Sequence, residues 1–586
     1  MEEEGLDHIL INLGLGPWQL INFLAAVVAL ASDAPNVLSS TFTNAPVDFH
    51  CIQHDLPHNN THRFDDSLSK CEVSAIRTNN SIENITSDED LFPLQPCRKW
   101  HFDQSMYLAT VTSEFNLVCD HAWLAPLFQL LYNAGTMTGD LFSGTISDRW
   151  GRRLALRAGA TLCLTSTLII GFAQNYSLIL IARYFLGISS TIMIFPSINL
   201  VMETLQPKHR SAVGMLLDLP YSLAIMGMGG LAYMVREWRY LHFYSSVFAF
   251  ILIPLAILLE ESPRWLIQQG RLEEAQAVLE RAAKLNRKPL PPKEQTKSII
   301  KKIYQANQPL KKEEEGGCCK KFVDGITVFY RTPSMRLISI VAPLSWFLLG
   351  ILYNGIPLNA NNFTNNPFIY MALAGLMELG SVVSGVFIAE RFNRVSVALV
   401  TFMVSGACVA AIVVVPEVTW WLKWVLVMAA MELISVTYCL EFIWAPELFP
   451  TVVRARGSSL CSFSSHAGCF VASFITEVLA RWVPWIPNLL FGVAGLIAAL
   501  LAKLLPETKD LPLCDTVQQV EDRALRLKGL DTTQLTSLCD NEDQNTVEYE
   551  ESILKNRQNR SNNERESNVG DEEKVMIINE ENIDIK

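Results

Sequence analysis

The chain has little charge for its length. Only 18% of its 586 residues are Asp, Glu, Lys or Arg, and half are apolar, whereas a soluble protein carries about 25% charged residues. Its net charge of −12 is accompanied by no basic surface of the kind that binds nucleic acid. The composition therefore excludes an ordinary soluble domain and indicates a membrane protein.

The motifs of common enzyme chemistry are also missing. The sequence has no GxxxxGK[ST] phosphate loop, no HExxH zinc motif, no CxxC pair and no nucleophile elbow. ATP-driven pumping and covalent catalysis therefore have no site in the sequence. We expect no enzyme activity, no cofactor and no bound metal.

The N-terminus lacks the basic start of a cleavable signal peptide. Residues 1–4 read MEEE, and the apolar run from Trp18 to Leu30 has no convincing cleavage site. The first apolar segment is therefore expected to stay in the protein as a helix.

The sequence does contain apolar runs of roughly 20 residues, the length that crosses a hydrocarbon core of about 30 Å. Because backbone groups in lipid must bond within their own segment, each run is predicted to be a helix. A long polar segment separates two sets of six. The twelve predicted spans are residues 18–41, 122–146, 154–175, 177–202, 211–235, 240–259, 336–357, 367–390, 395–416, 420–445, 456–480 and 484–505.

The basic loops predict the orientation. Arg149 and Arg152 follow the second span, Lys208 follows the fourth, and the central segment is rich in Lys and Arg, so this side is expected to face the cytoplasm. The predicted organisation is a cytoplasmic N-terminus at 1–17, helical halves at 18–259 and 336–505, a cytoplasmic central segment at 260–335, and a largely disordered acidic tail at 506–586.

A polar insert at residues 43–121 follows the first span. It holds four cysteines and three glycosylation sequons, the composition of a disulfide-stapled extracellular loop. The pairing stays open, because four cysteines allow three connectivities. The cysteines are Cys51, Cys71, Cys97 and Cys119, and the acceptors are Asn59, Asn79 and Asn84.

The loop between the second and third spans reads GTISDRWGRR. Its glycines permit close backbone approach and a sharp turn, its acid suits a helix N-terminus, and its arginines are predicted to hold acids of the other half while the cytoplasmic side is closed. A plain positive-inside loop is the alternative, which the spacing disfavours. The predicted latch residues are Gly144, Asp148, Arg149, Gly151, Arg152 and Arg153.

This loop resembles the helix 2–3 signature of the major facilitator superfamily, and Ala389–Arg394 is a weaker echo in which Asn393 replaces the usual Gly. Four more segments are similar to the organic cation, organic anion and carnitine transporters (solute carrier family 22 type): SEFNLVCD, ESPRWLIQQGRLEEA, APELFPTVVRARG and LPETKDLPL. The resemblance covers about residues 8–525. It implies an all-α membrane protein with twelve transmembrane helices in two pseudo-symmetric halves, a large extracellular loop after helix 1, alternating access and a polyspecific cavity.

Four charged residues assigned to cytoplasmic helix ends match charged positions of that branch. We expect them to form an ion-pair network that breaks and reforms during transport, with purely structural pairing as the alternative. They are Arg183, Glu203, Glu447 and Arg454.

Ionisable residues inside spans cost roughly 2.5–3.5 kcal/mol each on insertion scales, so they usually face a cavity or a partner. Here most are acids, which favours a cationic substrate. Glu378 matches an acid of the cation transporters, Asp218 is chosen on charge alone, and Glu432 and Glu441 fall on opposite faces of one helix. The predicted deep acids are Asp33, Asp140, Asp218, Glu378, Glu432 and Glu441.

The eleventh predicted span, residues 456–480, carries polar side chains at spacings of three and four. These side chains share one face of the helix, which is predicted to line the water path. His466 lies at its centre, where cation transporters of the branch carry an acid and anion or carnitine transporters an Arg. A structural histidine is the alternative to a ligand. Tyrosines are expected to add cation–π contacts. The predicted substrate ligands are Asp218, Tyr221, Tyr353, Glu378, Glu441 and His466.

The sequence therefore predicts a polyspecific transporter of small organic cations in the plasma membrane, with both termini cytoplasmic. A carnitine-like zwitterion or an organic anion is the alternative substrate within the same family. A non-transporting receptor or scaffold on the same fold is the alternative from a different class. The expected partners are the substrate and the lipid bilayer, with no nucleic acid.

Asp148→Asn tests whether the helix 2–3 loop acts as a latch in a carrier. If the helix 2–3 loop is a latch, the substitution is expected to reduce uptake of labelled cations at least tenfold at equal surface abundance. Surface biotinylation supplies the control. Unchanged uptake in a correctly delivered variant would show that the loop is no latch.

Overall fold

The computed structural model describes residues 3–51, 101–312, 327–359, 366–450, 453–509 and 516–527, together with residues 511 and 514 and short pieces between 62 and 100. Residues 3–515 that are described belong to one compact unit, and helix α23 (Val517–Leu527) belongs to a second. The predicted acceptors Asn59, Asn79 and Asn84, and most of the predicted acidic tail, lie outside the described residues.

Each predicted span has a helix. The first half contains α2 (Pro17–Leu38), α5 (Leu127–Trp150), α6 (Arg152–Phe172), α7 (Tyr176–Thr204), the pair α8 (Pro207–Leu216) and α9 (Leu219–Val235), and α10 (Trp238–Leu258). The second contains α15 (Pro333–Leu358), α17 (Pro367–Arg391), α18 (Arg394–Ala411), α19 (Trp420–Leu448), α20 (Arg454–Phe474) continued by a π-helical turn and α21 (Ala480–Trp482), and α22 (Ile486–Ala502).

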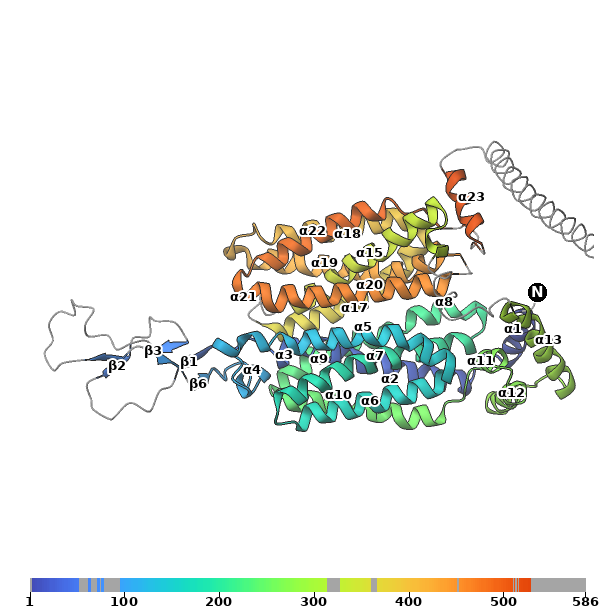
Figure 1. Ribbon diagram of the computed structural model, residues 1–586, viewed down its shortest axis with the longest axis horizontal. Helices are drawn as coiled ribbons and strands as arrows, with labels where there is room; N and C mark the ends of the chain where they lie inside the picture. Colours follow the sequence, from blue (N-terminus) through green and yellow to red (C-terminus); the bar gives the residue numbers. More distant parts are fainter. Residues whose placement is uncertain are drawn as a thin grey trace, which may run out of the picture. The chain divides into compact units, whose positions relative to one another are not determined.

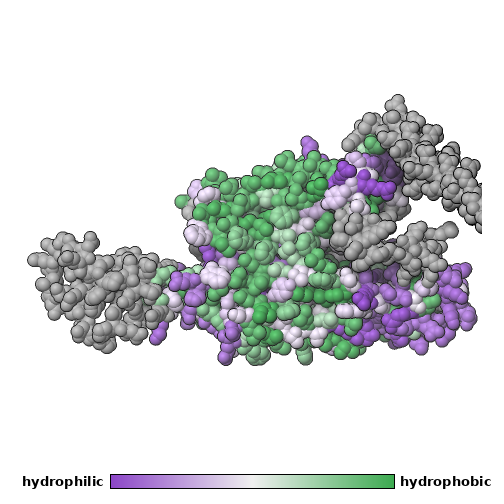
Figure 2. All heavy atoms as spheres, viewed as in Figure 1, coloured by the Kyte–Doolittle hydropathy of each residue, from purple (hydrophilic) through white to green (hydrophobic). Residues whose placement is uncertain are grey.

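Within the described residues, nine helices are long and apolar enough to cross a membrane, and two shorter apolar helices are α9 and α22. Helix α5 has 24 residues but a more polar composition. Figure 2 shows hydrophobic atoms over both helical groups and hydrophilic atoms at the end that carries α1 and α11–α13. An apolar belt of this kind fits a bilayer.

The fifth span is broken in the middle. Helix α8 ends at Leu216 and α9 begins at Leu219, with Asp218 between them. Pro220 explains the break, because proline has no N–H to donate to the preceding turn. The single span predicted at 211–235 is therefore two helical pieces.

The two halves meet along α5 with α20 and along α9 with α17. Glycines permit these close contacts: a Cβ on Gly229 would lie 2.6 Å from the Phe368 carbonyl oxygen, and one on Gly375 would lie 2.4 Å from the Met226 nitrogen. Figure 1 shows the strands at one end of the bundle, here called the loop end, and α1, α12 and α13 at the opposite end.

The loop after the first span forms three two-stranded antiparallel ladders. They pair β1 (Phe49–Cys51) with β6 (Trp100–Phe102), β2 (His62–Phe64) with β4 (Ala75–Arg77), and β3 (Glu72–Val73) with β5 (Gln95–Pro96). Short helices α3 (Ser40–Thr43) and α4 (Val111–Glu114) and a 3₁₀ turn (Cys119–Leu124) flank them.

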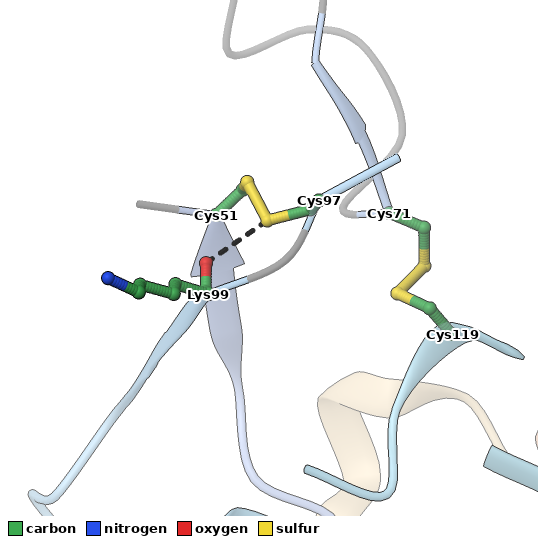
Figure 3. The surroundings of a disulfide bond; sticks show 5 residues. All are labelled: Cys51, Cys71, Cys97, Lys99 and Cys119. Atoms are coloured by element: carbon green, nitrogen blue, oxygen red, sulfur yellow. Dashed lines mark hydrogen bonds between the residues drawn. A yellow bond between two sulfur atoms is a disulfide. The ribbon is translucent and has the colours of Figure 1, made fainter. Parts of the chain in front are cut away.

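The connectivity that the sequence left open is Cys51–Cys97 and Cys71–Cys119 (Figure 3). The two bridges interleave along the chain and close loops of similar length, with sequence separations of 46 and 48 residues. Each removes conformational freedom from the unfolded loop.

A helical layer covers the opposite end. It consists of α1 (Glu3–Leu13), α11 (Pro263–Gln268), α12 (Leu272–Asn286) and α13 (Lys293–Lys312). The amphipathic helix expected at 271–284 is α12, and its apolar face is buried against the other three helices through Val278 and Leu279. Residues 1–17 are therefore a packed element and not merely a leader to the first span.

The tail expected from residue 506 begins later. Glu507 and Thr508 bond to the second half, and the Cys514 carbonyl accepts from Arg454 at 3.3 Å. The described tail residues 506–509, 511 and 514 thus belong to the bundle unit.

Gly187→Ala tests the packing of α5 on α7. The new Cβ would lie 2.1 Å from the Tyr132 carbonyl oxygen, so the helix backbones must separate. Overpacking of this kind costs about 1–3 kcal/mol, and we expect a lower thermal unfolding midpoint of the purified protein. Gly227→Ala is the matched control, since its Cβ meets nothing within 4 Å. Equal midpoints for both variants would contradict this packing.

Candidate functional site

A small pocket lies between the two halves, with a cavity volume of about 20 Å³. Helices α2 and α9 line it from the first half, and α15, α17 and α19 line it from the second. Three predicted ligands, Tyr221, Tyr353 and Glu378, meet there. The other lining residues are Leu38, Ile225, Asn354, Pro357, Ala374, Met431, Ile434 and Ser435.

Glu378 is the only charged side chain among these lining residues. It is 7% exposed. Its carboxylate accepts a hydrogen bond from the Tyr353 hydroxyl at 2.8 Å and another from the Ser435 hydroxyl. Tyr353 stacks on Tyr438, with ring centroids 4.2 Å apart and planes inclined by 10°. An acid and an aromatic pair therefore share one wall of the pocket.

Two other predicted ligands do not line this pocket. Glu441 is completely buried and accepts a hydrogen bond from Ser345 at 3.0 Å, between α19 and α15. Asp218 is half-buried at the α8–α9 break, within electrostatic range of Glu378. The structure therefore does not bring Glu441 to the pocket, because helix periodicity gives a residue's face but not the helix that covers it.

His466 also lies outside this pocket. Its Nδ1 is 2.5 Å from Asp140 Oδ2 on α5, so it joins the two halves. The polar stripe of α20 faces α5 here: Asn133 donates to the Ser473 hydroxyl at 2.7 Å and to the Cys469 carbonyl at 3.1 Å. The predicted water path is therefore, in this arrangement, an interface between helices.

Asp33 on α2 was predicted as a deep acid without a partner. It accepts hydrogen bonds from Ser190 on α7 and from the Tyr132 hydroxyl, the latter at 3.2 Å. Glu432 likewise accepts from Ser384 at 3.0 Å. Of the six deep acids, four thus have neutral hydroxyl partners.

The helix 2–3 loop is held within its own half. Arg152 is buried, with ion pairs to Asp148 at 3.1 Å and to Glu203 at 3.0 Å. Arg152 thus binds acids of its own half in this arrangement, and the expectation that these arginines hold acids of the other half while the cytoplasmic side is closed stays a prediction. Arg153 donates to the Ile257 carbonyl at 3.3 Å, also in the first half, and Arg149 is exposed.

The two glycines of this loop differ. Gly151 has φ +96°, and a Cβ there would lie 2.3 Å from Glu261, so the turn needs glycine. A Cβ on Gly144 would meet nothing within 4 Å, so the close approach expected there is absent.

The acid at the N-terminus of α6 is Glu261, which the sequence did not single out, and not Asp148. Its carboxylate accepts from the backbone N–H of Arg152 at 2.9 Å and of Arg153 at 3.2 Å. Burial raises the pKa of Glu261, and hydrogen bonds from Ser262, Arg153 and Arg152 oppose that rise. It therefore acts as a helix cap from a distant segment.

The second half repeats this arrangement. Glu507 accepts from the backbone N–H of Arg394 at 3.0 Å and of Val395 at 3.1 Å, and Arg394 pairs with Glu447 at 3.5 Å. The segment with Asn393 in place of Gly thus has the same contacts within its own half as the helix 2–3 loop.

Arg454 and Arg210 also correspond. Arg454 donates to the Pro446 carbonyl at 2.9 Å, and Arg210 donates to the Met202 carbonyl at 3.1 Å. The predicted single network is therefore two separate clusters, one in each half.

Arg183 was assigned to the wrong end. It lies seven residues after the start of α7, near the loop end, and is completely buried. Its guanidinium donates to the Phe128 and Asn36 carbonyls at 3.2 Å and to Gln129 at 3.0 Å. It also lies 4.2 Å from the Phe128 ring centroid. Arg183 thus binds the loop ends of α2 and α5 together.

The halves make further contacts near the loop end. The π-helical turn Ile475–Leu479 carries Glu477, which accepts a hydrogen bond from Asn44 at 3.3 Å. Arg481 donates to the Ala122 carbonyl at 2.9 Å. Phe42 stacks on Phe368 with centroids 5.5 Å apart. These contacts close the bundle at that end.

A family model described as sugar (and other) transporter matches residues 98–518. The chain therefore belongs to this family of membrane transporters within the major facilitator superfamily, whose members are not enzymes.

Its relatives are solute carrier family 22 proteins, which confirms the resemblance drawn from the motifs. Human solute carrier family 22 member 2 is 28% identical over 442 residues, 75% of this chain and 77% of that protein. The organic cation transporter protein of Drosophila melanogaster is 27% identical over 532 residues, 88% of this chain and 95% of that protein. Rat solute carrier family 22 member 12 is 28% identical over 452 residues, covering 77% and 79%.

Among solved structures, the inward open conformation of the E. coli xylose transporter XylE has a TM-score of 0.58 at 14% identity. The match covers 86% of this chain and 98% of that one. The predicted helical membrane fold of the major facilitator superfamily is confirmed.

Glu261→Gln weakens the cap on α6. A neutral amide accepts less strongly than a carboxylate, and loss of a cap costs about 0.5–2 kcal/mol. We expect a lower thermal unfolding midpoint for the purified protein, and a similar loss for Glu507→Gln. The exposed Glu273→Gln is the control. If Glu261→Gln unfolds at the same temperature as this control, the cap is of no consequence.

Proposed function

We propose that the chain transports small organic cations across the plasma membrane by alternating access. The observation that carries the proposal is Glu378, a buried carboxylate on the pocket between the halves whose two hydrogen-bond partners are neutral hydroxyls. The two hydroxyls satisfy the hydrogen-bonding capacity of the Glu378 carboxylate but carry no positive charge, so an entering cation can supply the counter-charge.

The tyrosines at the pocket also favour a positively charged substrate. Tyr353 and Tyr221 line the pocket with the acid, Tyr438 stacks on Tyr353, and a cation over an aromatic face gains roughly 0.5–2 kcal/mol. The pocket-lining residues include no Lys, Arg or His that would pair with an anionic group. Of the three substrate classes, an organic anion therefore fits this lining least well. A zwitterion needs a separate cationic partner for its carboxylate, and this lining offers none.

Alternating access is supported by where the halves touch. The cross-half contacts of Asn44, Asn133, His466 and Arg481 lie at the middle or the loop end of the bundle, whereas Arg152 and Arg394 bind acids of their own half at the opposite end. We propose that the loop end is extracellular, that twelve helices cross the membrane, and that both termini are cytoplasmic. A receptor or scaffold would need no acid-lined pocket at this interface.

Glu378→Gln is the sharpest test of the substrate's sign. In cells expressing the chain, we expect uptake of labelled tetraethylammonium to fall about tenfold or more, because loss of a charge-assisted contact costs roughly 1.5–3 kcal/mol and 1.4 kcal/mol is tenfold. Glu441→Gln is the matched control, a buried acid of the same half outside the pocket lining.

The same cells are then given labelled carnitine and an organic anion, with the membrane potential varied. Entry of the cation alone supports the proposal, whether or not its rate depends on voltage. Entry of the anion alone, or cation uptake that is equally strong in Glu378→Gln, contradicts it. Uptake of none of the three, with protein at the surface, favours the scaffold.

A further inference from the structure

One imidazole and one carboxylate join the two halves in the middle of the bundle. His466 on α20 and Asp140 on α5 lie 2.5 Å apart, and the Asp140 side chain is only 4% exposed. The second carboxylate oxygen, Oδ1, is buried and has no hydrogen-bond partner within the described residues. Neither residue lines the pocket around Glu378. The pair is therefore a second polar site, separate from the proposed cation site.

A second carboxylate lies near the pair. Asp33 of α2 lies within electrostatic range of His466 and is itself held by Ser190 and Tyr132. On α20, the Cys469 thiol donates to the Gly350 carbonyl of α15 at 3.6 Å and is influenced by Asp140.

Where α15 meets α20, the contact is between backbones, since a Cβ on Gly350 would lie 2.1 Å from the Ser465 carbonyl oxygen. Tyr438 of α19 stacks on Tyr353. It lies within electrostatic range of Cys469, Glu378, Asp218 and Asp33. Two carboxylates thus act on one imidazole, and a proton on His466 is the charge that balances them.

The pair must separate when the halves move apart, because α5 and α20 belong to different halves. Protonated, it is an ion pair that holds them together. Neutral, it is a weaker hydrogen bond that leaves Asp140 charged. The imidazole is the side chain whose charge changes within the physiological pH range. Proton occupancy therefore sets how strongly the halves are joined at this depth.

We propose that the Asp140–His466 pair is a proton-binding site, and that its proton and the organic cation bind in alternation, so that one proton leaves the cell for each cation that enters. Tyr221 lies within electrostatic range of both Asp33 and Glu378, so the two sites share one poorly screened region in which like charges repel. The proton comes from bulk water on one side and returns to bulk water on the other. The inference rests on the proposed function for the cation and adds the coupling ion.

The first experiment measures transport. The purified chain is placed in liposomes with the membrane potential clamped at zero by potassium and valinomycin, and uptake of labelled tetraethylammonium is followed with an interior at pH 6.0 or 7.5 and an exterior at pH 7.5. The wild-type rate is expected to rise several-fold with the acidic interior. His466→Gln is expected to give equal rates at both pH values, and His242→Gln, which changes a completely buried histidine of α10, is expected to retain the rise.

A wild type that transports the cation with no response to the pH gradient overturns the proton proposal and leaves the proposed function standing. So does a His466→Gln variant that keeps the response. A wild type that transports no cation contradicts the proposed function, and the proton site is then decided by a second measurement.

The second experiment needs no substrate. Asn133→Cys and Ser473→Cys replace two residues that meet across α5 and α20, and their cross-linking rate is divided by the rate in a His466→Gln background at the same pH. Because a protonated pair holds the helices together, this ratio is expected to fall as pH rises from 5.5 to 8.5. A ratio that does not change with pH overturns the proton site, whatever the chain transports.

Discussion

The structure depends on how carboxylates are kept in an apolar bundle. Four deep acids, Asp33, Glu378, Glu432 and Glu441, accept hydrogen bonds from serine or tyrosine hydroxyls of neighbouring helices. A hydroxyl satisfies a carboxylate by hydrogen bonding and supplies no counter-charge of the kind that an arginine would supply. Arg183, which is buried near the loop end, donates to backbone carbonyls and not to these acids. The same hydroxyl–carboxylate hydrogen bonds thus join neighbouring helices and leave an acid available to a cationic substrate.

The end opposite the loop is organised by a repeated cap. Glu261 closes the N-terminus of α6 and Glu507 closes that of α18, and each comes from the segment that follows the last helix of its own half. Each half therefore ties its third helix to its own end, which makes it a rigid body. Rigid halves that share few contacts at one end are what a rocking mechanism requires.

Much of this followed from the sequence, and the misses share a cause. Apolar length located every helix, and Glu378, Tyr353 and Tyr221 were correctly expected on one pocket, because the charge of a residue and its depth can be read along the chain. The hydrogen-bond partners Ser190 and Ser435 could not be predicted, because a serine in a sequence does not show which helix it faces. Arg183 was misplaced although its position just after the start of α7 pointed to the loop end. Glu261 and Glu507 could have been found by aligning the two halves, as each lies within two residues of a proline shortly after a terminal span.

The interruption at Asp218 has a consequence for motion. Helix α9 is fixed against α17 by the glycine contacts, whereas α8 is tethered through Arg210 to Asp7 of α1 at 2.9 Å. A continuous helix would transmit any swing of one attachment to the other. Because Pro220 removes a backbone donor at the joint, the span can flex there while both anchorages hold. The fifth span thus has a hinge between α8 and α9. Making that hinge rigid would slow the conformational cycle without changing the residues that line the pocket.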